Sequence, residues 1–152
     1  MISIQIAEAL FPQEIPPELI KQCELAAQMT LVRAHAPTAV GVTIVITDDD
    51  QLHQLNRVFL GIDAPTDVLS FPAEEVDPDS GEEYLGDVLI SYPRAVAQTD
   101  SGKHALSDEL QLLVVHGVLH LLGYDHTEDE KENMWAIQSQ ILADLGSPLN
   151  PP

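Results

Sequence analysis

The strongest constraint on this chain is a mostly apolar segment, residues 107–126, that carries three of the six histidines. The segment opens with a serine and two acids, which are typical of a helix N-terminus. Gly123 is the kind of residue at which a helix ends in a left-handed conformation. The pattern therefore predicts a helix over 107–122. His116 and His120 are four residues apart, so their rings are expected on one helix face, one turn apart.

The third histidine, His126, follows the glycine, and a sharp turn there would return it toward the other two. Three neutral imidazoles with open coordination positions are typical of a catalytic zinc centre, whereas a structural zinc usually has four protein ligands. The spacing therefore predicts one Zn²⁺ bound by His116, His120 and His126. The offsets also match a zinc-peptidase pattern, but the glutamate that acts there as general base is Gly117 here. We expect this glycine to leave space for a bulky substrate beside the metal.

Hydrophobic periodicity predicts the remaining elements. Strands are expected at 2–6, 40–47, 68–72, where Pro72 ends the strand, and 84–92. Helices are expected at 17–35, from Asp48 or Asp49 to Phe59, at 93–100, and at 127–145 with Thr127 as N-cap. The length suits a single domain, which we place at residues 1–146, followed by a disordered tail at 147–152.

The composition is strongly acidic, with 25 Asp and Glu against 6 Lys and Arg and a net charge of −19. Such a chain repels polyanions at long range, so any nucleic acid must be held by local positive charge. No apolar run is long enough to cross a bilayer and the N-terminus lacks signal-peptide features, so we expect a cytoplasmic protein without a membrane partner. The single cysteine, Cys23, excludes an intrachain disulfide and is interpreted as a buried helix residue.

Three blocks of sequence resemble the signatures of the YbeY family of metal-dependent endoribonucleases. They are HGVLHLLGYDH at 116–126, DAPTDVLSFP at 63–72 and LGDVLIS at 85–91. The resemblance implies an α+β fold with a small mixed sheet of about four strands, flanked by helices, and a zinc-site helix like that of the metzincins. It implies that the three histidines bind zinc. It also implies cleavage of single-stranded RNA in small-subunit ribosomal RNA maturation and ribosome quality control, with ribosomal small-subunit proteins or assembly factors as partners.

One departure from the family pattern concerns an arginine, whose place is taken by Leu60. Arg57, three residues earlier, would face the same side of a helix and is the candidate catalytic cation, with Arg94 as a second choice. Asp67 is the candidate to orient a histidine or accept a proton, although an aspartate there also suits a turn. Two rival functions stay open: a metzincin-like metallopeptidase, and a non-catalytic ribosome-assembly factor with a structural metal.

Overall fold

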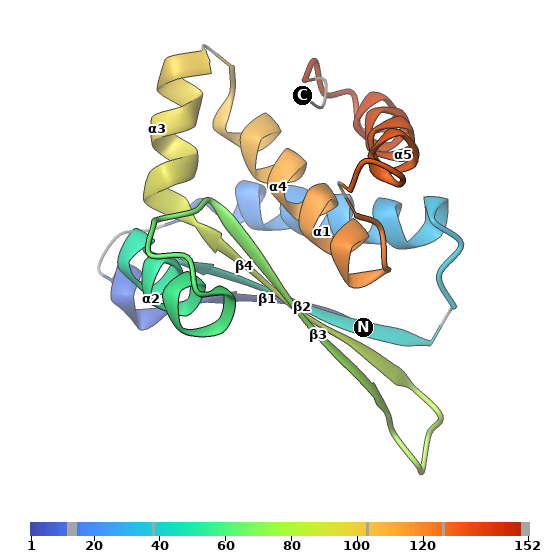
Figure 1. Ribbon diagram of the computed structural model, residues 1–152. Helices are drawn as coiled ribbons and strands as arrows, with labels where there is room; N and C mark the ends of the chain where they lie inside the picture. Colours follow the sequence, from blue (N-terminus) through green and yellow to red (C-terminus); the bar gives the residue numbers. More distant parts are fainter. Residues whose placement is uncertain (12–14, 38, 103, 126, 150–152) are drawn as a thin grey trace.

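A four-stranded mixed sheet forms the centre of the computed structural model, which describes residues 1–11, 15–37, 39–102, 104–125 and 127–149 (Figure 1). The strands are β1 (Ile2–Ile6), β2 (Val40–Thr47), β3 (Val68–Val76) and β4 (Glu83–Ser91), in the order β1-β2-β4-β3. The pairs β1–β2 and β2–β4 are parallel, and β3 runs antiparallel to β4 at one edge. The α+β fold and the small mixed sheet are confirmed.

Helices cover both faces of this sheet. They are α1 (Pro17–Arg33), α2 (Asp49–Leu60), α3 (Tyr92–Gly102), α4 (Leu106–Leu121) and α5 (Lys131–Asp144), with a short 3-10 helix at Glu8–Leu10. Helices α1 and α4 pack side by side on one face, and α5 packs against both of them (Figure 1). Helix α2 packs on the opposite face, against β3 and β4. Within the described residues, no helix is long and apolar enough to span a membrane.

The main core lies between the sheet and the layer of α1, α4 and α5. Ile44 and Ile46 of β2 face this layer. Val45 points to the other side of the sheet, where it packs with Leu52 of α2. Burial on both faces explains why β2 is a nearly continuous β-branched run. Helix α4 is enclosed by the sheet and by α1, α3 and α5, so most of its residues are buried. The histidine-bearing helix is therefore a rigid internal element of the fold.

The predicted end of a strand at Pro72 is wrong, because β3 continues to Val76. Proline has no N–H to donate, but β3 is an edge strand, where a missing donor is tolerated. The pairing shifts between Pro72 and Glu75, and the partner strand carries Gly86 opposite this irregularity. Gly86 has φ +139°, and a Cβ there would collide with the carbonyl oxygen of Phe71. The glycine thus allows the two strands to approach at the shift.

The predicted N-cap is confirmed for α2 and is wrong for α5. The Asp48 side chain accepts a hydrogen bond from the Gln51 N–H at 2.9 Å, which confirms the cap of α2. The predicted N-cap at Thr127 is wrong: α5 begins at Lys131, and the Thr127 carbonyl instead accepts from the N–H groups of Glu130 and Lys131. The division into a domain at 1–146 and a disordered tail stays a prediction, and residues 150–152 lie outside the described part of the chain.

Candidate metal centre

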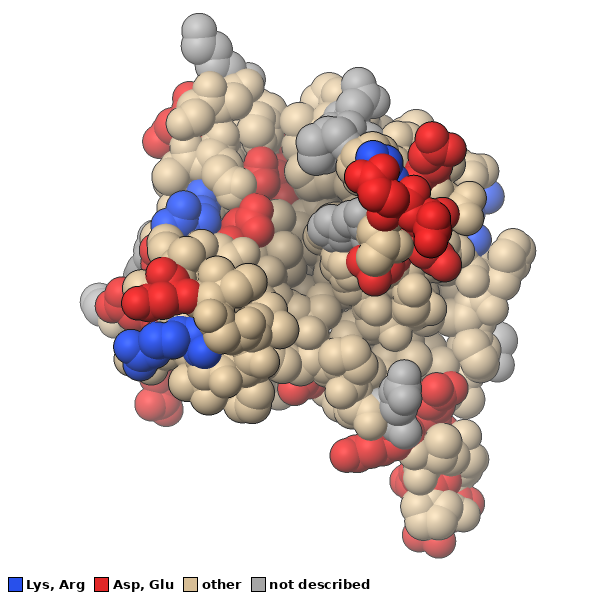
Figure 2. All heavy atoms as spheres, viewed as in Figure 1, with Lys and Arg blue, Asp and Glu red and all other residues tan. Residues whose placement is uncertain are grey.

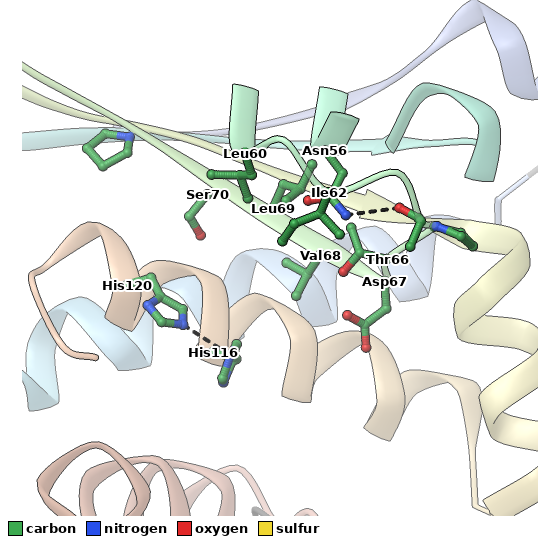
Figure 3. Close-up of a pocket in the computed structure, with 13 residues that line it drawn as sticks. Asn56, Leu60, Ile62, Thr66, Asp67, Val68, Leu69, Ser70, His116 and His120 are labelled. Atoms are coloured by element: carbon green, nitrogen blue, oxygen red, sulfur yellow. Dashed lines mark hydrogen bonds between the residues drawn. The ribbon is translucent and has the colours of Figure 1, made fainter. Parts of the chain in front are cut away.

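A cleft of about 630 Å³ lies between α4, the edge strand β3 and the C-terminal end of α2 (Figure 3). His116 and His120 of α4 line one side of it. The opposite side is made by the end of α2, the loop that follows it and the first half of β3, and includes Leu60, Ile62 and Asp67. The cleft therefore brings the two signature blocks of the sequence together, although they are about fifty residues apart.

The two histidines are arranged as ligands of one metal ion would be. Both are half-buried, their Nε2 atoms are 3.2 Å apart, and their rings meet edge to face with centroids separated by 4.7 Å. Only one of these facing nitrogens can carry a proton when the two share a hydrogen bond. Two nitrogens bound to one tetrahedral zinc at 2.0–2.1 Å would be about 3.3 Å apart. The pair thus fits a zinc ion without rearrangement of the backbone.

A third side chain contacts this pair. The ring Nδ1 of His116 lies 2.9 Å from Oε1 of Gln138, a contact that favours a proton on Nδ1 and a lone pair on the Nε2 that faces His120. Gln138 lies on α5 and is only 1% exposed. Metal-bound histidines commonly donate their second ring N–H to such an acceptor. Sequence reasoning missed this residue, and its one signal was a polar side chain among the buried positions of α5.

The third predicted ligand, His126, lies outside the described residues. Among the residues that the structure describes, no group of three or more histidine, cysteine, aspartate or glutamate side chains is placed to hold a metal ion. The complete ligand set therefore stays a prediction, and the geometry that supports it is that of His116 and His120.

Asp67 lines the same cleft as the histidines, and its predicted part in orienting a histidine or accepting a proton stays a prediction. Its Oδ2 accepts a hydrogen bond of 3.2 Å from Nε2 of Gln98, and its backbone carbonyl accepts from the Ser91 N–H. Nearby, Arg94 makes two hydrogen bonds to Asp49, at 2.9 and 3.0 Å. These bonds hold the pKa of Asp49 below its usual value and raise the pKa of Arg94, to which the Asp67 charge also contributes.

Arg57 is not among the described residues that line the cleft. It is exposed and borders a separate hollow of about 240 Å³ with Asp50, His53 and Gln54. Positions three apart on a helix differ by about 60° in direction, and here Leu60 lines the cleft while Arg57 borders the separate hollow. The place that the resemblance assigns to an arginine is held by the apolar Leu60, and a catalytic part for Arg57 stays a prediction.

Gly117 has a different role from the one expected. It faces the sheet, not the cleft, and a Cβ there would collide with Val88 of β4 and approach Ser70 Oγ to 3.3 Å. The Ser70 hydroxyl donates to the Gly117 carbonyl at 2.8 Å and joins β3 to α4. The prediction that this glycine leaves space beside the metal is wrong; the missing side chain lets α4 lie close to the sheet.

The face of the molecule drawn in Figure 2 agrees with the strongly acidic composition. Figure 2 shows acidic side chains over the tip of the β3–β4 hairpin and over the segment that leads into α5, with few basic groups on this face.

Cys23 is fully buried, and burial raises the pKa of its thiol to about 12. This agrees with its interpretation as an unreactive core residue.

Comparison with known proteins decides between the rival classes. The profile of the family described as Endoribonuclease YbeY matches residues 6–146. A relative named Endoribonuclease YbeY from Chloroflexus aurantiacus is 47% identical over 133 residues, 82% of this chain and 86% of the relative. A protein of the same name from Brevibacillus brevis is 35% identical over 96% of this chain and 98% of its own length. The chain belongs to the YbeY family. The family's enzymes are endoribonucleases, hydrolases that cleave RNA phosphodiester bonds.

A solved structure supports the fold independently. The solution structure of TM1509 from Thermotoga maritima superposes with a TM-score of 0.63, and the match covers 95% of this chain and 89% of that protein. The two sequences are 22% identical over the match. Sequence comparison supports membership of the YbeY family, and the solved structure supports the fold. The position of the histidine pair comes from the structure of this chain.

Proposed function

We propose that this protein is a zinc-dependent endoribonuclease that cleaves single-stranded RNA in the maturation of small-subunit ribosomal RNA and in ribosome quality control. The observation that carries the metal-dependent part is the 3.2 Å approach of the Nε2 atoms of His116 and His120, with Gln138 Oε1 at 2.9 Å from the other ring nitrogen of His116. Membership of the YbeY family supports the endoribonuclease part.

His116 and His120, together with the predicted ligand His126, would hold the ion. The chemistry that a zinc ion held there would supply is that of a Lewis acid, for a phosphate oxygen or for the attacking water. Asp67, whose Oδ2 is oriented by Gln98, is the carboxylate on the same cleft that we assign to proton acceptance. The buried α4 keeps the two imidazoles in place, and the Ser70–Gly117 hydrogen bond fixes the distance between the walls.

In this proposal the two candidate arginines, Arg94 and Arg57, do not contact the phosphate that is cleaved. Arg94 lies near Asp67 but its guanidinium is engaged by Asp49, so it orders this side of the cleft. Arg57 lies on the exposed side of α2, where it would meet a phosphate away from the cleavage site. The scarcity of positive charge leads us to propose that ribosomal small-subunit proteins or assembly factors supply phosphate contacts during processing.

The decisive experiment compares zinc-loaded protein on single-stranded RNA, duplex RNA and a casein-like peptide, with and without a chelator. We expect cleavage of the single strand only, and loss of activity with the chelator. His120→Ala should lose both zinc and activity, whereas the matched variant His53→Ala, which alters an exposed histidine on α2, should keep both.

Three results would count against the proposal. Peptide hydrolysis by the wild-type protein would favour the metallopeptidase. Stoichiometric zinc with no cleavage of any RNA would favour an assembly factor with a structural metal. Full zinc occupancy in the His120→Ala protein would remove this residue from the ligand set.

A further inference from the structure

Three large apolar side chains are exposed at the end of α2 and in the turn that follows it, and two of them line the cleft. They are Phe59 (63% exposed), Leu60 (58%) and Ile62 (52%), and we call them the apolar rim. Exposed apolar side chains that occur singly need no explanation, but a contiguous group of this size usually marks a binding surface. Of the other exposed large apolar residues in the described chain, Met1 and Val32 line a separate hollow that neither His116 nor His120 borders.

Local structure holds this rim against the mouth of the cleft. Helix α2 ends at Leu60, and Gly61 adopts the left-handed conformation with φ +71°, which turns the chain sharply. Ile62 then follows along the same wall, so both Leu60 and Ile62 line the cleft that contains the histidines (Figure 3). Nδ2 of Asn56 donates to the Ala64 carbonyl at 2.9 Å and pins the turn. The rim is therefore continuous with the candidate metal centre.

The chemistry of this wall selects what it can bind. None of the described residues that line the cleft is a lysine or arginine, and Asp67 is the one acidic residue among them. Apart from the proposed metal ion, such a lining offers a phosphate no lysine or arginine to pair with. Nucleobases present flat, uncharged faces that bind aromatic and aliphatic side chains. Phe59 is oriented by an edge-to-face contact with Phe71 of β3, at a centroid distance of 5.5 Å.

We propose that the apolar rim binds the bases of single-stranded RNA that lie next to the phosphate at the metal centre. The inference rests on the proposed function and names the part of the substrate that this surface recognises. A protein partner is the other possible occupant of an exposed apolar surface. It is disfavoured because a protein seated on Leu60 and Ile62 would cover the mouth of the cleft that must admit the substrate.

The test is a double variant, Leu60→Ser with Ile62→Ser, in zinc-loaded protein. The matched control is Leu25→Ser, a half-exposed leucine on α1. In steady-state cleavage of single-stranded RNA we expect KM of the double variant to rise about tenfold, in line with the loss of base contacts, while kcat stays within about threefold. The control should match the wild type. A ribose-phosphate backbone without bases should inhibit all three proteins equally weakly.

A second variant keeps the inference testable if the double variant folds poorly. Leu60→Phe enlarges the flat apolar surface and should lower KM without changing inhibition by the base-free backbone. Unchanged KM in the folded double variant, or equally strong binding of RNA and base-free backbone, would overturn the inference and leave a protein as the occupant of the rim. If zinc-loaded wild type cleaves no RNA, the proposed function fails first and the inference falls with it.

Discussion

The hydrogen bond from His116 to Gln138 offers the sharpest test of the candidate metal centre. Replacing Gln138 with methionine keeps an unbranched side chain of similar length and removes the acceptor. The 2.9 Å bond from His116 Nδ1 is then lost, and with it the preference for the tautomer that directs the Nε2 lone pair toward His120. We expect weaker zinc binding in a protein that still folds.

The size of the effect follows from the geometry. Loss of a partner that orients a metal-bound histidine typically lowers metal affinity 10- to 100-fold, which corresponds to about 1.4–2.7 kcal/mol. Folding should change less. Gln138 is 1% exposed and His116 is half-buried, so removing this acceptor costs at most about 1–3 kcal/mol, and the greater apolar burial of methionine offsets part of it.

Zinc affinity is measured by competition with a chromophoric chelator, and the His116 tautomer by nitrogen NMR of the metal-free protein. Gln138→Glu retains an acceptor and should bind zinc at least as tightly as the wild type. Gln140→Met makes the same change at an exposed position of α5 and should bind zinc normally. A Gln138→Met protein with wild-type zinc affinity and an unchanged tautomer would refute the assigned role.

Three further predictions follow from other contacts. Gly117→Ala is expected to lower the free energy of unfolding by about 1 kcal/mol, because overpacking against Val88 exceeds the gain in helix propensity. Urea denaturation measures this loss. Val88→Ala in the same chain should relieve part of it. Leu60→Arg adds a cation to the cleft wall, so the slope of RNA affinity against salt should steepen by about 0.7, measured by anisotropy titrations; an unchanged slope would mean that no phosphate passes there. Arg94 holds the pKa of Asp49 below its unfolded value, so the charged form stabilises the fold above about pH 4 and this contribution disappears as acid protonates Asp49. Asp49→Asn should therefore lower Tm near neutral pH and hardly change it below about pH 3, whereas an equal loss at both would assign the effect to packing.

The parts of the fold that local sequence controls were predictable. The helix with His116 and His120 and its end at Gly123 follow from spacing and from one glycine, which has φ +97° in the structure. Strand β2 follows from its β-branched run. In each case the determining residues are neighbours in the chain.

The parts that sequence reasoning missed depend on distant contacts. Pro72 could be read as a strand end, because only the sheet order reveals that β3 is an edge strand. Gln138 is 22 residues from His116, and nothing local pairs them. Gly117 lies beside a histidine in sequence, but the 100° turn between successive helix residues directs it onto the sheet. To predict that Arg57 does not line the cleft would likewise have required the exact residue at which α2 ends.

The two sides of the cleft have different physical requirements, and the structure assigns them to different kinds of element. Metal ligands must be held within a few tenths of an ångström, and the candidate ligands His116 and His120 lie on α4, which is buried by the sheet and three other helices. The opposite side is formed by an exposed helix end and a turn, where side chains can change without disturbing the core. In a protein with a net charge of −19, long-range attraction of RNA is absent, so short-range contacts on this exposed side are expected to contribute to the binding free energy. Substitutions on α4 should therefore act on the metal and on kcat, and substitutions on the apolar rim on KM.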